Sequence, residues 1–343
     1  MGSVKELVLE SGPADAVLGT GKFVFSNDFS VFDWGKMPDT ILLKGRALCM
    51  MAAFNFELME KIGVQTHYLG LIEDGVVKKF NDVSEPAGEM KVMVTRKPEL
   101  EFKKGKYDYA LFRKKAGENF LVPLEIIFRN SVPVGSSARK RFLPSKAGLK
   151  GKKWPEKNVR LKKPIIDFST KLEAKDRYLS EKEALEISCL SKEKFSELKE
   201  IALKVNRIIT EQAERQGLEH EDGKIEMFCF RGELFVADVA GTFDENRFSF
   251  AGKEISKEVI RQHYKKSQPG WADAVEKAKA KAEKKKDRDW KKYCKVEPKS
   301  LPPALLELVS EMYCAGANRY CGKEIFRARG LGEALEKLYS WRE

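Results

Sequence analysis

Three charged residues stand in an otherwise apolar hairpin near the middle of the chain. Lys224 and Glu226 lie at the start of the run KIEMFCF, and Asp238 ends the run ELFVAD. Both runs are apolar and aromatic, as in a sheet covered on both faces, and Arg231-Gly232 joins them. Because a buried charge is costly without a partner or a ligand, these three side chains are candidates for chemistry.

The length of the loop decides whether the three side chains share a face, because side chains alternate along a strand. A two-residue loop of Arg231-Gly232 would turn Asp238 away from Glu226. A three-residue loop with glycine at the bulge position would bring Lys224 opposite Asp238, with Glu226 diagonal to both. We expect a loop of odd length.

Two carboxylates and an ammonium group on one face suit a divalent cation that is bound together with phosphate oxygens. Magnesium is normally held by one or two carboxylates plus nucleotide oxygens. The alternative interpretation is a buried ion pair at a strand end. The hairpin sequence considered alone favours this alternative.

Composition bounds the class of protein. The 343 residues suffice for two domains or for one large domain with additions, and 42% hydrophobic with 34% charged residues is typical of a soluble globular protein. The chain has no signal-peptide core and no apolar run of about 18 residues, so we expect a cytoplasmic protein. The six cysteines form no CxxC pair, and with only three histidines the chemistry must come from Lys, Arg, Asp and Glu.

The net charge of +12 favours anionic partners, among them nucleic acid, phosphorylated metabolites and acidic surfaces. Much of the excess lies between Lys265 and Lys299, in a run that includes KAKAKAEKKKDRDWKKYCK. Such a run is more often a solvated helix face or a flexible segment than a binding patch, so it does not identify the ligand.

The first half of the chain is predicted to be β-rich with one helix. Strands and turns fill the first 45 residues, and an amphipathic helix spans residues 44–62 with a stop at Gly63. Four later runs are predicted as strands: THYLGLI, EMKVMVT, YDYALF and LVPLEIIFR. The stretch 136–163, rich in Gly, Ser, Lys and Pro, is predicted as a loop.

The second half is predicted to be largely helical around the hairpin. Ser180 and Glu183 form a capping box that opens one helix. A longer helix ends before Gly217, and a terminal helical region spans residues 304–339. The longer helix carries an apolar stripe typical of a core face: Phe195, Leu198, Ala202, Val205 and Ile209.

Several separate segments, taken in order, resemble one family. They are GSVKELV at the N-terminus, SNDFSVFDWG (26–35), KG (44–45), PLEIIFRN (123–130) followed by GSS (135–137), STKLEAKDRYLSEKEA (169–184), KIE with VAD twelve residues after the glutamate, FDENR (243–247) and PPALLELVSEMYCAGANRYCGK near the end. Each motif alone is weak, but the ordered set covers most of the chain. It is similar to phosphoribosylaminoimidazole-succinocarboxamide synthetase, the SAICAR synthetase family.

The resemblance implies an ATP-dependent ligase of de novo purine biosynthesis. Enzymes of this family join L-aspartate to the carboxylate of carboxyaminoimidazole ribotide and release SAICAR, ADP and phosphate. A carboxylate is a poor acyl donor, so ATP phosphorylates it and the aspartate amine then displaces phosphate. This chemistry needs cations for phosphates and carboxylates, and acidic ligands for magnesium.

The resemblance also implies a role for each candidate residue. Glu226 and Asp238 would bind magnesium bridging the ATP phosphates, and Lys224 and Asp238 would be catalytic. The nucleotide-binding residues would be Lys5, Leu121 and Glu226. The substrate-binding residues would be Asp33, Arg129, Ser136, Lys171, Asp176 and Arg247, where the planar fork of arginine suits phosphate and carboxylate.

The chain departs from the family pattern at three places. The first strand reads GSVK without the usual second basic residue, Val239 follows Asp238 where an acidic residue is usual, and KLEFG appears as KIEMF. Two insertions are expected, at residues 99–119 and at about 264–287.

We therefore expect an α+β protein with a two-lobed, SAICAR synthetase-like fold. A β-rich lobe, residues 1–120, would cover the nucleotide. A larger ATP-grasp-like lobe, residues 121–343, would hold magnesium and the substrates and carry the C-terminal helices. The expected partners are small molecules; neither nucleic acid nor a membrane is expected, and a homo-oligomer stays open.

Two alternatives stay open at this point. One is another ATP-dependent ligase or kinase that acts on a related anionic metabolite. The other is a basic nucleic-acid-binding protein that uses the Lys-rich run. Single residues also have plain structural interpretations: Lys5 as a surface residue, Ser136 as a turn residue and Asp176-Arg177 as a local ion pair.

Overall fold

The computed structural model describes residues 4–103, 105–134, 136, 138–285, 287 and 289–342. Gly2 and Ser3 of the first-strand motif, and Gly135 and Ser137 of the GSS motif, lie outside the described residues.

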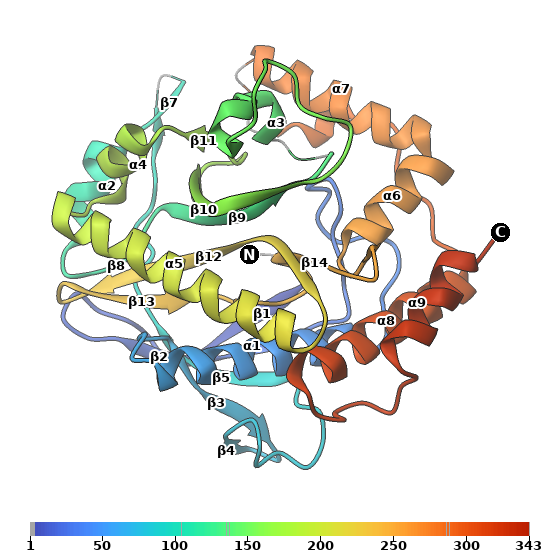
Figure 1. Ribbon diagram of the computed structural model, residues 1–343. Coiled ribbons are helices and arrows are strands. Elements are labelled where there is room, and N and C mark those ends of the chain that lie inside the picture. Colours follow the sequence, from blue (N-terminus) through green and yellow to red (C-terminus); the bar gives the residue numbers. More distant parts are fainter. Residues whose placement is uncertain are drawn as a thin grey trace.

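The N-terminal part of the chain forms an antiparallel sheet with the strand order β1-β2-β5-β3-β4. Its strands are β1 (Lys5–Ser11), β2 (Gly19–Phe25), β3 (Tyr68–Glu73), β4 (Val76–Lys78) and β5 (Glu89–Val94). Helix α1 (Lys44–Lys61), which confirms the helix predicted at 44–62, packs against β2, β3 and β5 and also contacts two helices from later in the chain (Figure 1).

An eight-stranded antiparallel sheet forms the centre of the molecule, in the order β11-β10-β9-β12-β14-β15 with β8 and β13 also paired to β12. Its strands are β8 (Asn119–Leu121), β9 (Leu124–Val132), β10 (Val159–Thr170), β11 (Tyr178–Leu179), β12 (Glu219–Phe230), β13 (Glu233–Ala237), β14 (Asn246–Phe250) and β15 (Lys253–Glu254). The long strand β12 therefore has two sets of neighbours: β9 and β14 near its start, and β8 and β13 near its end.

The hairpin of β12 and β13 has a two-residue loop, so the expectation of an odd loop is wrong. Phe230 pairs with Glu233, and both loop residues, Arg231 (φ 48°) and Gly232 (φ 81°), are left-handed. That pair of conformations is the type I′ turn, whose twist matches the flanking strands. Two hydrogen bonds hold Arg231 in its left-handed backbone: its N–H donates to the Glu118 carbonyl at 2.8 Å and its guanidinium to the Ala16 carbonyl at 2.9 Å.

The even loop also rules out the predicted pairing of Lys224 with Asp238. Glu226 pairs with Ala237, and strand β13 ends there. Alternation would turn the next side chain away, but Asp238 takes a left-handed backbone with φ 67°. Because that conformation breaks the strand's alternation, Asp238 still reaches the cavity that Glu226 lines.

One predicted strand is a helix. The run YDYALF falls mainly in α2 (Tyr109–Ala116), because the Asp108 side chain caps it by accepting the Leu111 N–H at 2.8 Å. Strands β6 (Phe102–Lys103) and β7 (Lys106–Tyr107) form a small hairpin just before it. The predicted loop at 136–163 contains two short helices, α3 (Ala138–Arg141) and η1 (Pro144–Ala147), and its last residues belong to β10.

The remaining helices are α4 (Glu181–Ser188), α5 (Lys192–Arg215), α6 (Glu258–Ser267), α7 (Pro269–Lys285), η2 (Lys291–Tyr293), α8 (Pro303–Cys321) and α9 (Leu331–Ser340). The capping box on α4 is confirmed, and the apolar stripe of α5 is buried. Helix α5 packs against β9, β10 and β12 (Figure 1). A single hydrophobic core joins both sheets to α1, α5 and α8. None of the described helices combines the length and the apolar character that a membrane crossing needs.

A buried ion pair ties α1 to the second sheet. Lys44 is fully buried, and its ammonium donates to the Asp244 carboxylate at 2.7 Å. The Tyr313 hydroxyl of α8 donates to the other oxygen of Asp244, also at 2.7 Å. Gly45 is required beside Lys44, because a Cβ there would lie 2.7 Å from the Ser26 carbonyl oxygen. The KG motif therefore serves the junction of the two sheets.

Candidate active site

Two cavities are lined in part by residues of β12. The first, which we call the polar cavity, has a volume of about 490 Å³. Six of the candidate residues from the sequence line it: Asp33, Arg129, Ser136, Asp176, Lys224 and Arg247. The second, the hairpin cavity, has a volume of about 420 Å³ and is lined by the other five: Lys5, Leu121, Lys171, Glu226 and Asp238.

The hairpin cavity sits between the first sheet and the end of β13. Lys5 of β1 reaches across and pairs with Asp238 at 2.8 Å, while Lys171 pairs with Glu226. Leu7, Phe23, Leu121 and Leu172 give the cavity an apolar wall. Lys97 also lines the cavity, so an apolar wall is combined with three lysines and two carboxylates, which suits a flat ring that carries a phosphate chain.

Glu125 of β9 lies between two lysines that line different cavities. Its carboxylate accepts a bond from the Lys224 ammonium at 2.7 Å and lies 3.7 Å from the Lys171 ammonium. Lys224 also pairs with Glu245 at 3.2 Å. Lys224 lines the polar cavity, whereas Lys171, on the other side of Glu125, lines the hairpin cavity. A group transferred between ligands in the two cavities would pass this bridge of Lys171, Glu125 and Lys224.

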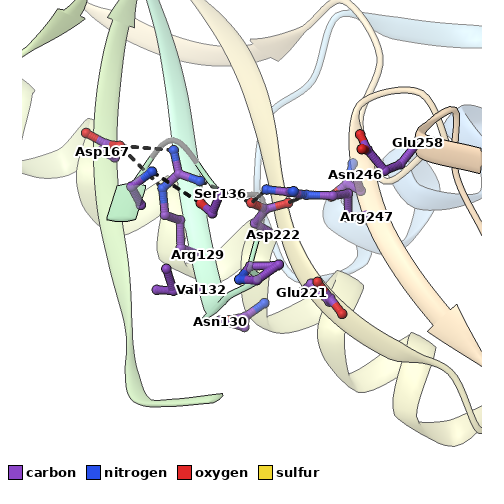
Figure 2. A network of polar contacts seen from close by, with 12 residues as sticks. Arg129, Asn130, Val132, Ser136, Asp167, Glu221, Asp222, Asn246, Arg247 and Glu258 are labelled. Carbon is purple, nitrogen blue, oxygen red and sulfur yellow. Dashed lines mark hydrogen bonds and ion pairs between the residues drawn. The ribbon is translucent and has the colours of Figure 1, made fainter. Parts of the chain in front are cut away.

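A chain of alternating charges forms one wall of the polar cavity (Figure 2). Arg129 of β9 bonds to Asp167 of β10 and to Asp222 of β12, both at 3.1 Å. Arg247 of β14 grips the same Asp222 through two bonds, one of them 2.7 Å long. Arg141 of α3 adds a third guanidinium on Asp167. Of these residues, Arg129, Asp222 and Arg247 line the cavity, so two guanidinium groups share one carboxylate at its wall and retain donors for an anionic ligand.

Burial and neighbouring charges shift the pKa values of the two carboxylates in the hairpin cavity in opposite directions. Burial, and next the charge of Asp238, raise the pKa of Glu226 to about 7 against the lowering effect of Lys171. Burial would also raise the pKa of Asp238, but Lys5 and Lys171 hold it below its usual value. Two neighbouring carboxylates, one buried and one partly exposed, that resist joint ionisation are the kind of pair that a divalent cation stabilises.

The polar cavity contains a carboxyl group that titrates near neutral pH. Loss of solvent, and next the charge of Glu125, raise the pKa of Asp176 to about 6. Burial alone would lower the pKa of the Lys224 ammonium, but Glu245, Glu125 and Glu226 raise it well above its usual value. Lys224 is therefore a fixed cation, whereas Asp176 can hold or release a proton under working conditions.

Sequence reasoning missed several residues of the site. Glu125 and Glu245 stand inside the motifs PLEIIFRN and FDENR, and their acidic side chains inside otherwise buried runs were the available signal. Asp222 had the same signal, two residues before Lys224. Lys279 had none, because it is one of many lysines in a helix that is expected to be solvated.

Among the described residues, no group of three or more His, Cys, Asp and Glu side chains comes together as a metal cluster. A metal at Glu226 and Asp238 would therefore rely on two carboxylates and on oxygen atoms from a ligand, which is the set that magnesium takes with nucleotides. The donor set fits magnesium better than zinc, which prefers nitrogen and sulfur.

The fold and the two cavities define an α+β protein with two neighbouring cavities lined by charged side chains. Comparisons with known proteins agree. A sequence model of the SAICAR synthetase family matches residues 16–278. A provisionally named phosphoribosylaminoimidazole-succinocarboxamide synthase of Archaeoglobus fulgidus is 46% identical over 343 residues, covering 98% of each chain.

Solved structures share the fold. A SAICAR synthase from Saccharomyces cerevisiae, solved in complex with SAICAR, is 19% identical with a TM-score of 0.62 over 94% of each chain. A SAICAR synthetase (Type-2) solved in complex with ADP is 22% identical with a TM-score of 0.53, over 76% of this chain and 88% of that one. The chain belongs to the SAICAR synthetase family, a family of ATP-dependent ligases, and the nucleic-acid-binding alternative is not favoured.

Proposed function

We propose that the protein joins L-aspartate to the carboxylate of carboxyaminoimidazole ribotide, with ATP as the energy source, and releases SAICAR, ADP and phosphate. One observation carries the assignment of the site: the Lys171, Glu125 and Lys224 bridge connects a cavity with paired carboxylates to a cavity walled by guanidinium groups. Family membership supplies the reaction, and the two cavities offer one place for each anionic partner.

The hairpin cavity is the proposed ATP site. Leu121 and the neighbouring apolar side chains would contact the base, and Lys5 would exchange its bond to Asp238 for the ATP phosphates. Glu226 and Asp238 would hold magnesium, and Lys171 would leave Glu226 for a phosphate or carboxylate oxygen. Bound magnesium would neutralise charge on the phosphates during transfer.

The polar cavity is the proposed site for the ribotide. Arg129, Ser136 and Arg247 would hold its phosphate, since two guanidinium groups there share Asp222 and retain donors for a ligand. The opposite end of the ligand would then lie near Lys224. Its ammonium would orient the carboxylate towards the hairpin cavity and stabilise the charge that develops as that carboxylate is phosphorylated.

The proposed chemistry has two steps. A carboxylate oxygen of the ribotide bonds to the γ-phosphorus of ATP, and the bond to the bridging oxygen breaks, so ADP leaves. The aspartate nitrogen then bonds to the activated carbonyl carbon, the bond from that carbon to the phosphate oxygen breaks, and the nitrogen loses a proton. Asp176, with a pKa of about 6, is an acceptor of suitable strength in the same cavity.

We also propose a division into two lobes. The β-rich part, residues 1–120, would cover the nucleotide, because Lys5, Leu7 and Phe23 of the first sheet form one wall of the hairpin cavity. Residues 121–343 would supply the carboxylates and the substrate pocket. The inserted stretch 99–119 would then lie beside the base, since it runs directly into Leu121 of the cavity wall.

Omitting each reactant in turn tests the proposed function. With ATP, magnesium, carboxyaminoimidazole ribotide and L-aspartate, the purified protein should release ADP at its full rate, and omission of any one should reduce release to background. SAICAR formation is followed in parallel by mass spectrometry. ADP release that is unchanged without aspartate would defeat the assignment and would favour a kinase.

A further inference from the structure

Lys279 is the one lysine of α7, among its described residues, that lines the polar cavity, and Lys265 of α6, at the start of the same Lys-rich run, lines it as well. Helix α7 buries Trp271, Val275, Ala278 and Ala282. Lys279 is only 15% exposed, whereas Lys277 on the same helix is exposed. Lys279 therefore does not belong to a solvated face, the more frequent of the interpretations given for such a run.

The ammonium of Lys279 bonds to a carboxylate oxygen of Asp33 at 2.6 Å and lies 5.2 Å from the centre of the Trp290 ring. The two residues of this ion pair are 246 positions apart in the chain. Asp33 keeps 71% of its side-chain surface exposed. The pair thus fixes one oxygen of Asp33 and leaves most of the carboxyl group facing the cavity.

The backbone around Asp33 needs such support. Phe32 (φ 54°) and Asp33 (φ 58°) are two successive left-handed residues without glycine, a conformation that costs about 1–2 kcal/mol per residue. Two aromatic rings from beyond residue 268 hold this turn: the Trp271 ring lies 5.5 Å from the Phe32 ring, and the Trp290 ring lies 5.9 Å from the Trp34 ring. Strained backbone of this kind persists only where the surroundings over-determine it.

The charges around Asp33 indicate the chemical class of ligand that its carboxylate would bind. A carboxylate that is held ionised and exposed to a cavity attracts a ligand with N–H donors, and both amine-bearing reactants of the proposed reaction qualify: L-aspartate and the aminoimidazole. We infer that Lys279 is a positioning residue that, with Trp271 and Trp290, holds the carboxylate of Asp33 for the amine of a substrate. This inference rests on the proposed function for the identity of that substrate, but not for the contact itself.

Three variants test it: Lys279→Ala, the conservative Lys279→Arg, and Lys277→Ala as the matched control. For Lys279→Ala we expect the KM for one amine-bearing reactant to rise about fivefold, as for the loss of one partly buried ion pair. The KM for ATP should not change, because ATP would bind in the other cavity. Lys279→Arg should restore the KM, and Lys277→Ala should leave all three KM values at the wild-type level.

Measuring the KM for L-aspartate and for the ribotide separately shows which amine Asp33 contacts. An Lys279→Ala enzyme with wild-type KM for both would overturn the inference, as would an equal rise in the KM for ATP, which would indicate a general structural defect.

Hydrogen exchange of residues 28–37 tests the contact without catalysis. Here Trp34 N–H bonds to Val31 and Gly35 N–H to Ser30. Lys279→Ala should speed exchange in this segment and Lys277→Ala should not; unchanged exchange would contradict the positioning role. If the wild-type protein lacks aspartate-dependent activity, the proposed function fails while this measurement still decides whether Lys279 holds the Asp33 turn.

Discussion

At the scale of single residues, the hairpin cavity depends on one carboxylate with an unusual backbone. Asp238 reaches the cavity through its left-handed conformation, and Lys5 pairs with it at 2.8 Å. Its pKa is held low although burial opposes ionisation, so the group is a permanent anion. An anion fixed in this way is suited to a metal ion that arrives with the nucleotide.

Asp238→Asn should therefore reduce kcat by at least about 100-fold, because the amide keeps the shape of the side chain but loses the charge for a metal. Far-ultraviolet circular dichroism and the Tm should show an intact fold. The exposed Asp273→Asn on α7 is the matched control and should keep full activity. A near-normal rate in Asp238→Asn would remove this residue from the proposed metal site.

Asp176 provides a pH test at the same scale. Its pKa is raised to about 6, so the carboxylate is the main form at pH 7 and becomes protonated as the pH falls. If it accepts the proton of the amine, kcat/KM should fall about tenfold per pH unit below pH 6. Asp176→Asn should lose this limb and keep a low, flat rate. An unchanged acid limb in the variant would assign the titration to another group.

The residues of the site were more predictable than its geometry. Every candidate side chain taken from the motifs lines one of the two cavities, and their roles there stay predictions. The motifs did not predict that Lys224 and Asp238 line different cavities. That separation depends on the register of β12 and on one backbone angle at Asp238, neither of which a pattern of apolar residues encodes.

At the scale of elements, local signals predicted the helices well and the turns less well. The capping box on α4 and the stripe on α5 were recognisable, because both depend on spacing within a few turns of the helix. The strand predicted at YDYALF was wrong because its alternating aromatic residues suggest a strand, whereas the cap by Asp108 starts a helix. The prediction of an odd hairpin loop was wrong because Arg231 adopts a backbone conformation that its residue type does not favour.

Gly232 tests the type I′ turn. Its φ is 81°, and nothing lies within 4 Å of the position that a Cβ would take, so Gly232→Ala adds backbone strain without a clash. We expect the free energy of unfolding to fall by about 1 kcal/mol. Gly12→Ala also meets nothing within 4 Å and lacks the positive φ, so urea denaturation should show almost no change for it. Equal effects of the two variants would contradict the left-handed turn.

At the scale of the whole molecule, buried polar groups join elements that are distant in sequence. His220 of β12 lies fully buried between α5 and β14: the Thr210 hydroxyl of α5 contacts its Nδ1 at 2.8 Å, the Asn246 side chain of β14 contacts its Nε2 at 3.0 Å, and Phe248 of β14 stacks on it. These contacts satisfy a neutral ring, in which Nε2 donates to Asn246 and Nδ1 accepts from Thr210. Burial therefore lowers the pKa of His220 to about 4.

This shift predicts how stability depends on pH. Above pH 6.5 the ring is neutral in both the folded and the unfolded state, and His220 makes its full contribution to stability. As the pH falls towards 4, only the unfolded chain takes up the proton, so the free energy of unfolding decreases. One such group changes the free energy of unfolding by about 1.4 kcal/mol per pH unit.

Carboxyl groups whose pKa is raised, such as Glu254 with a pKa of about 7, act in the opposite direction, so the pH dependence of the wild-type protein alone is ambiguous. The difference between wild type and His220→Asn isolates the histidine: urea denaturation between pH 6.5 and 4.5 should give the variant a smaller loss of stability, and parallel pH profiles would show that His220 is not the group responsible.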